Sequence, residues 1–362
     1  MITTEVIELI LRAFLIQNGL LSIKAIQSGY INQTFLLKIK GDTDRKLILQ
    51  SINKDIFPDI DALMTNVSSV CHSIENCLKE KKWNNYHNLH FYQTRNGQYY
   101  FENEGVFYRL LDYVEHHTID AENVSSQVAL EAGKILARFH RLTNDMNTAE
   151  IKEIIPGFHR IDLRYDQFRK IDINGNERYG ETRDFYEQVV SFEYLVKQFT
   201  EIFTRNELPI RIVHNDPKLS NILFDENQKG LTMIDLDTVM PGFLNNDFGD
   251  AIRSLTNTSD ENELDLEKVG FDMALFDSFS KGYLSEVESI ISDKEKKYLA
   301  LFALLITFEQ LIRFYGDYLN HDAYYAVSYP THNLQRSKVQ LKLLQQMSAR
   351  YEDMLSSVLR TK

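Results

Sequence analysis

Two short segments bring together residue types that are suited to phosphoryl transfer. Residues 213–221 contain the pattern His-x-Asp-x-Lys-x-x-Asn, and residues 233–237 read Met-Ile-Asp-Leu-Asp. Phosphoryl transfer requires a carboxylate that accepts or orients the hydroxyl proton of the acceptor, together with oxygen ligands that hold a metal ion against the phosphates. Both requirements are met within these two segments.

Four polar residues in the two segments have predicted catalytic or metal-binding roles. Asp216 is the predicted base, and Lys218 lies two residues later, where a point charge could reach the transferring phosphate. Asn221 and Asp235 are the predicted magnesium ligands, because amide and carboxylate oxygens suit a hard cation. The order and spacing are typical of a kinase catalytic loop followed by a metal-binding strand. The alternative is that Asp216 and Asn221 cap a turn and that Asp235 merely ends a strand.

The pattern of apolar residues and turns predicts the elements that hold these segments. The catalytic segment follows a short strand at 210–213, and a buried strand at 230–234 precedes Asp235. The other expected strands are 21–27, 33–39, 46–52, 89–94, 98–102 and 106–113. The expected helices are 5–18, one that opens near 59 or 61 and runs to about 81, then 123–142, and about 179–205, 264–284, 293–319 and 333–359. A sheet-rich first third and a helical remainder predict an α+β protein of two lobes, with a hinge near 111–116.

Composition excludes several classes of protein. The chain has 362 residues, of which 43% are hydrophobic and 25% charged, with 52 acidic and 40 basic residues and a net charge of −12. A nucleic-acid partner is not expected, because nucleic-acid binders usually carry a basic surface. Cys71 and Cys77 do not share a face of the predicted helix, which argues against a disulfide and favours a cytoplasmic protein. The longest apolar run, 298–308, is too short to span a bilayer, so no membrane association is expected.

Several blocks resemble one family of enzymes. Residues 29–35 (Gly-Tyr-Ile-Asn-Gln-Thr-Phe), 47–53 (Leu-Ile-Leu-Gln-Ser-Ile-Asn), 234–242 (Ile-Asp-Leu-Asp-Thr-Val-Met-Pro-Gly), 247–253 (Asp-Phe-Gly-Asp-Ala-Ile-Arg) and 330–336 (Pro-Thr-His-Asn-Leu-Gln-Arg) look like parts of N-acetylhexosamine 1-kinases. These belong to the superfamily of aminoglycoside phosphotransferases and choline kinases.

The resemblance implies a protein-kinase-like two-lobe fold. Residues 1–113 would form a β-rich nucleotide-binding lobe, and residues 114–362 a helical lobe with the catalytic loop and the acceptor site. The implied reaction uses ATP and Mg²⁺ and moves the γ-phosphate to the anomeric hydroxyl of GlcNAc or GalNAc. The partner would then be a small amino sugar, and the protein a monomer or weak homodimer.

The predicted nucleotide contacts are Gly29, Asn32, Thr34 and Gln50. Protein kinases place a lysine on the third strand and pair it with a helix glutamate. Here the matching position holds Gln50, and the following helix offers Thr65 and Asn66 in place of glutamate. Lys46 lies on the same strand face as Gln50 and is a weak substitute.

Asp247-Phe248-Gly249 spells the metal-binding motif of protein kinases, but Asp235 has the better spacing from Asn221. By resemblance, Asp247 is expected to brace the catalytic loop from behind, and His214 is given a similar bracing role. Asp237 would share a face with Asp235 in an extended chain and is a candidate for the metal or the acceptor. Its alternative role is to cap a turn.

A sugar pocket needs fixed donors and acceptors around the hydroxyls and a flat surface for the ring. Candidate acceptor-binding residues, chosen for these properties, are Asp237, His159, Arg164, Tyr165, Arg313, His332, Asn333 and Arg336. The alternative for the pair at 332–333 is the N-cap of the last helix, and for the arginines at 313 and 336 it is a surface salt bridge.

Two rival functions stay open. The same chemistry could serve an aminoglycoside, choline or homoserine, and the acidic run 260–267, interpreted as a solvated helix start, could attract a cationic acceptor. A non-catalytic nucleotide-binding pseudokinase is the rival of another class. Gln50 favours it, and the intact Asp216, Asn221 and Asp235 argue against it.

Overall fold

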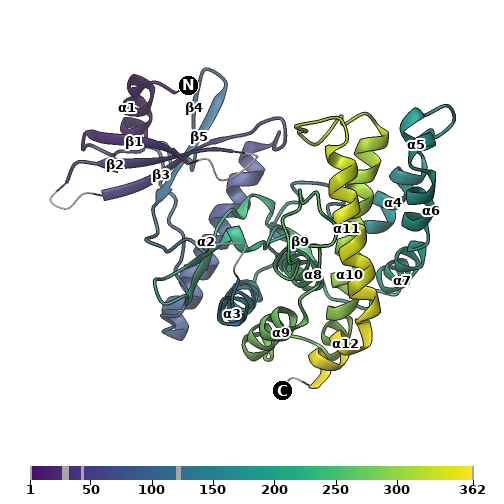
Figure 1. The fold of residues 1–362 in the computed structure, drawn as a ribbon. Coiled ribbons are helices and arrows are strands. Elements are labelled where there is room, and N and C mark those ends of the chain that lie inside the picture. The colour runs from purple at the N-terminus through teal and green to yellow at the C-terminus, as the bar shows by residue number, and fades with distance from the viewer. Residues whose placement is uncertain (1, 27–31, 42–44, 120–123, 361–362) are drawn as a thin grey trace. The chain divides into compact units, whose positions relative to one another are not determined.

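A computed structural model describes residues 2–26, 32–41, 45–119 and 124–360. The chain divides into two compact units: unit 1 is Met1–His116 with Ala149–Ile155, and unit 2 is His117–Thr148 with Pro156–Lys362. The predicted α+β class is confirmed, because unit 1 contains an antiparallel sheet and unit 2 is mainly helical (Figure 1). The sequence did not predict that residues 149–155 return to unit 1.

The sheet of unit 1 has five antiparallel strands. They are β1(Leu20–Ile26), β2(Gln33–Ile39), β3(Arg45–Ile52), β4(Phe101–Asn103) and β5(Val106–Asp112), in the order β1-β2-β3-β5-β4. Strands β1, β2, β3 and β5 lie within a residue or two of their predicted positions, because alternating apolar residues mark them clearly.

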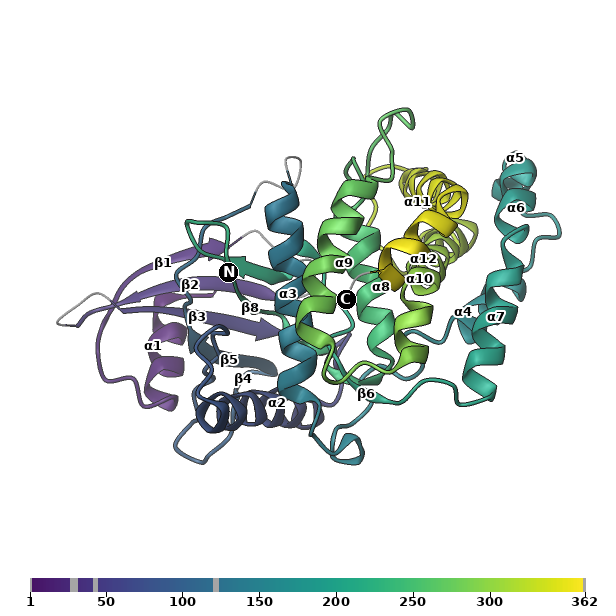
Figure 2. The ribbon, with the colours of Figure 1, turned by 90° about the horizontal axis from the view of Figure 1, so that it is seen from below.

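Helix α1(Thr4–Ala13) covers one face of this sheet (Figure 2). Its apolar side chains pack into one buried cluster with alternate residues of β2, β3 and β5, such as Leu37, Leu49 and Leu110. Because successive strand residues point to opposite faces, Thr34, Gln50 and Arg109 belong to the other face.

Helix α2(Ile60–Lys81) begins at Asp59, whose side chain accepts a hydrogen bond from the backbone N–H of Ala62 at 2.8 Å. Helix α2 binds residues 149–155 through Asn66. The side-chain Nδ2 of Asn66 donates to the carbonyl of Lys152 at 2.8 Å, and its Oδ1 accepts the N–H of Lys152 at 3.0 Å. Asn66, which this helix offers where protein kinases have a glutamate, is buried and therefore has a structural role.

The predicted hairpin at 89–102 is wrong in part. The turn exists, since Gly97 has a φ of 78° and its N–H donates to the carbonyl of Thr94 at 2.9 Å. Its flanks do not form a ladder, however, and Phe91 makes only an isolated bridge with Leu111. Strand β4 pairs with β5 across a tight turn at 104–105 instead.

Unit 2 is built on long buried helices. Helix α3(Ser126–Thr143) packs closely on α9(Met273–Val287) (Figure 2). Gly133 and Gly282 permit this approach, because an added Cβ would collide with the backbone of Phe279 or Leu130 respectively.

Helix α10(Asp293–Leu319) matches its predicted range and packs against several other helices of unit 2. By length and composition α10 could cross a membrane, but 89% of its most apolar 18-residue window is buried inside the protein. It is therefore a core helix of unit 2.

Apart from one helix of 18 residues, the remaining elements of unit 2 are shorter. The helices are α4(Ile161–Arg169), α5(Glu177–Glu181), α6(Arg183–Val190), α7(Glu193–Thr204), α8(Leu244–Leu255), α11(His332–Ala349) and α12(Tyr351–Arg360). The strands form two small ribbons, β6(Arg211–Val213) with β9(Met240–Gly242) and β7(Ile222–Phe224) with β8(Gly230–Met233).

Several predicted helix boundaries in unit 2 are wrong. The expected helix 179–205 is three helices, the expected helix 333–359 is broken at Arg350, and α4 and α8 were not predicted. The expected helix 264–284 begins only at Met273. The acidic run before it is a series of turns in which side chains of Asp260 and Asp265 bind backbone N–H groups two residues ahead.

Candidate active site

The candidate catalytic loop runs from the end of β6 through a single 3₁₀ turn, Leu219–Asn221, into β7. Asn215 has a φ of 66°, a left-handed conformation that asparagine tolerates better than most residues. Its side-chain Nδ2 donates to the carbonyl of Thr238 at 2.9 Å, and the Thr238 hydroxyl donates to the carbonyl of His214 at 2.7 Å. The segment after β8 thus holds the bend that presents Asp216.

Asp247 supports the loop from α8. Its two carboxylate oxygens each accept a backbone N–H at 2.7 Å, one from His214 and one from Asn215, and His140 Nε2 donates to it at 2.8 Å. Burial alone would raise the pKa of this fully buried carboxyl, but its hydrogen bonds and the neighbouring histidines bring the pKa below its ordinary value. The predicted bracing role agrees with this geometry.

His214 connects the loop to the strand that precedes Asp235. Its Nε2 donates to the carbonyl of Ile234 at 2.9 Å, and its Nδ1 accepts the N–H of Asp216 at 3.3 Å. Only a neutral ring can accept at Nδ1. Complete burial lowers the pKa of His214 and so favours this neutral form.

Asp216, Lys218 and Asn221 lie together. Asp216 Oδ2 accepts a hydrogen bond from Lys218 Nζ at 2.7 Å and another from Asn221 Nδ2 at 2.9 Å. Within the described part of the chain no hydrogen bond to Asp216 Oδ1 is formed. One oxygen of this half-buried carboxylate is therefore fixed, and the other is able to accept a hydroxyl proton.

The residues predicted to hold magnesium suit that ion. Asn221 uses its Nδ2 for Asp216, so its Oδ1 is the atom left for a cation. The backbone N–H of Ile234 donates to the carbonyl of Asn221 at 2.8 Å, which joins the residue before Asp235 to Asn221. The described residues contain no group of three or more His, Cys, Asp or Glu that could hold a metal. Mg²⁺ fits such a sparse site, because it keeps waters and takes further oxygens from phosphates.

Lys218 lies in a negative environment. Burial would lower the pKa of its ammonium, but Asp216, Asp235 and Asp250 raise the pKa above its ordinary value. Three carboxylates therefore contribute to the potential at one lysine. Such a lysine stays charged and can meet an incoming phosphate.

His159 was predicted to contact the acceptor, but the protein itself occupies both of its ring nitrogens. Nδ1 lies 3.1 Å from Glu309 Oε2, and Nε2 lies 3.3 Å from the carbonyl of Asn215 in the catalytic loop. Burial opposes the charged form of His159, but Glu309 raises its pKa above the ordinary value. A protonated ring donates to both neighbours, so His159 positions the loop.

The sequence did not single out Asp250 and Glu309, which also lie in this region. Arg253 donates to Asp250 at 2.9 Å and to Glu261 at 3.2 Å, and these carboxylates together with Asp216 raise the pKa of Arg253 although burial opposes it. The available signal was the Asp-x-x-Arg spacing in α8, which places two side chains on one helix face. Glu309 gave no signal within its apolar helix.

Arg313, a predicted acceptor residue, follows Glu309 by one helical turn. Its guanidinium lies 5.8 Å from the centre of the Phe158 ring and 5.7 Å from that of Tyr325. Burial opposes its charge, but Tyr325 and Glu309 raise its pKa. It is therefore not the surface salt bridge considered as its alternative.

Three other predicted acceptor residues lie in different surroundings from those expected. Asp237 does not continue an extended chain, because Asp235 is left-handed with a φ of 62° and the next three residues form a 3₁₀ turn. Tyr165 packs in the core against Phe168 and Phe308. Arg164 is on α4 and donates to Gln167 at 3.3 Å.

His332, Asn333 and Arg336 form one network near the start of α11. His332 and Arg336 both bind Asn262 Oδ1 at 2.8 Å, and Asn333 donates to Asp317 at 2.9 Å. Arg336 Nη1 also donates to Asn333 Oδ1 at 3.2 Å. Thr331 occupies the N-cap position of α11, so the alternative considered for residues 332–333, an N-cap, is not observed.

In unit 1, the predicted nucleotide contact Gly29 lies outside the described residues. Asn32 Oδ1 accepts the N–H of Asn53 at 3.0 Å, and Gln50 Nε2 donates to Thr34 Oγ1 at 3.2 Å. Lys46, the substitute cation considered from sequence, binds Glu115 at 2.7 Å.

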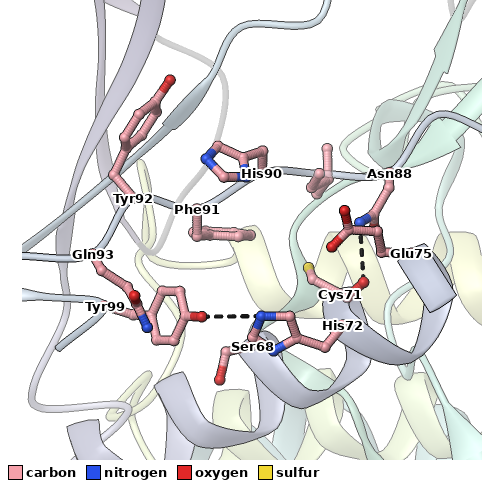
Figure 3. Close-up of a pocket in the computed structure, with 11 residues that line it drawn as sticks. Ser68, Cys71, His72, Glu75, Asn88, His90, Phe91, Tyr92, Gln93 and Tyr99 are labelled. Carbon is pink, nitrogen blue, oxygen red and sulfur yellow. Dashed lines mark hydrogen bonds between the residues drawn. The ribbon is translucent and has the colours of Figure 1, made fainter. Parts of the chain in front are cut away.

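Unit 1 also contains a pocket of about 360 Å³ between α2 and residues 88–93 (Figure 3). His72 contacts the hydroxyl of Tyr99 at 3.2 Å, and Asn88 donates to the carbonyl of Cys71 at 3.0 Å. Burial raises the pKa of the Cys71 thiol to about 12, so it is no nucleophile at neutral pH. The pocket contains none of the predicted site residues.

Comparison with known proteins gives a consistent result. The model of a family described as "Phosphotransferase enzyme family" matches residues 22–277. An aminoglycoside phosphotransferase from Alicyclobacillus acidocaldarius has a similar fold, with a TM-score of 0.59 at 14% identity over 98% of this chain and 95% of that one. A spectinomycin phosphotransferase in complex with ADP and spectinomycin has a TM-score of 0.56 at 12% identity over 97% and 99%. A choline kinase from Cryptosporidium parvum has a TM-score of 0.54 at 15% identity over 92% and 91%.

Proposed function

Because the chain belongs to the phosphotransferase enzyme family, we propose that it transfers the γ-phosphate of ATP to the anomeric hydroxyl of an N-acetylhexosamine. Three predictions that do not depend on the identity of the acceptor are confirmed. They are the superfamily, the kinase-like two-lobe α+β fold, and an ATP-dependent phosphotransferase with an alcohol group as acceptor. The sugar, its C1 hydroxyl, magnesium and the role of each residue belong to the proposal.

The proposed chemistry uses the free oxygen of Asp216. The acceptor hydroxyl gives its proton to Oδ1 while the hydroxyl oxygen attacks the γ-phosphorus, and the bond from that phosphorus to the bridging oxygen of ADP breaks. Asn221 keeps the carboxylate in place through Oδ2, and Lys218 turns from Asp216 to the transferring phosphoryl group. An anomeric hydroxyl is more acidic than an ordinary alcohol, so a carboxylate is an adequate base.

Asn221 Oδ1 and Asp235 would hold magnesium, which when bound neutralises negative charge on the phosphates. The donor is proposed to be an adenine nucleotide, and the spectinomycin phosphotransferase that shares this fold was solved with ADP. Unit 1, with Asn32, Thr34 and Gln50, is proposed as the nucleotide-binding lobe. Its first segment ends at His116, three residues beyond the boundary expected at 113–114. The protein is expected to be a cytoplasmic monomer or weak homodimer.

One observation favours a neutral acceptor over a cationic one. Two carboxylates near the catalytic loop are already matched by cations, since Asp250 pairs with Arg253 at 2.8 Å and Glu309 with protonated His159 at 3.1 Å. Arg313 adds a further positive charge beside Glu309. A choline or an aminoglycoside would be repelled by these cations. A sugar needs only donors and acceptors, which such pairs supply.

An acceptor panel tests the proposal. ATP consumption would be measured with GlcNAc, GalNAc, choline, homoserine and an aminoglycoside, each with and without magnesium. The proposal predicts magnesium-dependent turnover with the two hexosamines. Turnover only with a cationic acceptor would refute the sugar assignment and leave the kinase reaction intact. Binding of ATP without turnover on any small alcohol would favour the pseudokinase.

A further inference from the structure

We propose that Arg109 is a positioning residue that orients the side-chain amide of Gln50 so that its N–H binds a nucleotide phosphate. The pair would replace the third-strand lysine of protein kinases. The proposal rests on the proposed function, because it concerns how this phosphotransferase holds its donor.

The sheet register places the residues concerned side by side. Gln50 on β3 lies opposite Arg109 on β5 and opposite Thr34 on β2. Arg109 Nε donates to Gln50 Oε1 at 2.9 Å, and Gln50 Nε2 donates to Thr34 Oγ1 at 3.2 Å. A directed chain of hydrogen bonds therefore crosses three strands on the face opposite α1.

The direction of this chain follows from the chemistry of arginine. A guanidinium has donors only, so the Gln50 amide must turn its oxygen to Arg109 and its nitrogen away. The amide nitrogen has two hydrogens, and Thr34 receives one of them. The second hydrogen, and the hydroxyl hydrogen that Thr34 keeps, have no acceptor within the described part of the chain. Both are donors suited to an anion.

Arg109 itself is a fixed anchor. Its side chain is 2% exposed, its Nη1 lies 3.9 Å from Met64 Sδ on α2, and its guanidinium lies 5.6 Å from the centre of the Phe91 ring. Phe91 also lines the pocket drawn in Figure 3. A buried arginine held in this way acts through Gln50, and its charge further polarises the amide.

Lys46, the other candidate cation on the same face of β3, already forms an ion pair. Lys46 pairs with Glu115 at 2.7 Å near the start of β3. This makes Lys46→Met the matched control, because it also removes a cation from β3. It should leave nucleotide binding unchanged.

Titration calorimetry of the full-length chain with ADP and with adenosine tests the proposal. Gln50→Glu keeps an acceptor for Arg109 and removes the donors, so ADP should bind at least about tenfold more weakly, as expected for a lost hydrogen bond to a charged group. Arg109→Met should weaken ADP binding similarly, because the amide is then free to turn its oxygen outward. Adenosine, which has no phosphate, should bind all variants equally.

A double variant adds an independent test. Gln50→Lys with Arg109→Met restores a lysine on β3 and removes the like charge beside it, so ADP affinity should return towards that of the unmodified protein. Thermal melting of each variant monitors folding. A parallel loss of ADP and adenosine affinity would mean that the pair only supports the sheet, and unchanged ADP affinity in Gln50→Glu would also overturn the proposal. Either outcome would leave the proposed function intact as long as the unmodified protein transfers phosphate.

Discussion

The carboxylate of Asp247 accepts a hydrogen bond from the backbone N–H of Asn215 at 2.7 Å, immediately before Asp216 in the chain. The same carboxylate also accepts the N–H of His214. A buried side chain on α8 therefore sets the direction in which the catalytic loop leaves β6. The metal motif of protein kinases, Asp-Phe-Gly, is here a support for the loop.

Asp235→Ala and Asp247→Asn should have different effects on magnesium dependence. Removal of Asp235 takes away a proposed ligand, so the magnesium concentration for half-maximal activity should rise. Asp247→Asn keeps the shape of the side chain, but its amide has one oxygen in place of two and can accept only one of the two loop N–H groups. We therefore expect kcat to fall by about tenfold or more, with an unchanged magnesium requirement. Magnesium titrations of both variants give the answer, and the reverse pattern would contradict these assignments.

Asp216→Asn should lower kcat by about 10²–10⁴-fold, the usual contribution of a general base. The substitution keeps the size of the side chain and removes the proton acceptor. ATP affinity should hardly change, because Asp216 is assigned to the acceptor. Steady-state kinetics with a separate measurement of ATP binding check this. Near-native kcat would show that another group is the base.

His159 should make the stability of unit 2 depend on pH. Its folded pKa is raised above the ordinary 6.5, so its contribution is fully present below that value and is lost as pH rises through the folded pKa. His159→Leu removes the hydrogen-bonded partner of the buried Glu309, with only the charge of Arg313 left beside it, and should cost roughly 3 kcal/mol at about pH 6. The difference from the unmodified protein should shrink at about pH 9. Urea unfolding at both pH values measures this, and a difference that grows with pH would mean a neutral His159.

The sequence correctly predicted those elements whose hydrophobic pattern matches their burial in the fold. The strand Gln33–Ile39 and the helix Asp293–Leu319 have the expected bounds. The helix is a long, largely buried apolar segment that begins at a capping box formed by Ser292 and Glu295. Helix α8 was missed although Leu244, Phe248, Ile252 and Leu255 recur at helical spacing. Its polar residues Asn245, Asn246, Asp247 and Asp250 are buried as well, which the sequence does not indicate.

The candidate site shows the same division. The loop residues Asp216, Lys218 and Asn221 are close in sequence, so their motif was visible, and the structure brings them within hydrogen-bond distance. Partners such as Glu309 and Arg109 were not predictable, because only the packing of helices or the pairing of strands brings them to His159 and Gln50. Long-range pairing of this kind has no signature in a single sequence.

The identity of the product tests the central claim most directly. The chain would be incubated with ATP, magnesium and GlcNAc or GalNAc, and in parallel with their methyl glycosides, and the products analysed by phosphorus NMR. We expect an anomeric phosphate coupled to the C1 proton from both free sugars and no product from the glycosides, because methylation removes the attacking oxygen. A phosphate at C6, or phosphorylation of the methyl glycosides, would contradict a sugar 1-kinase.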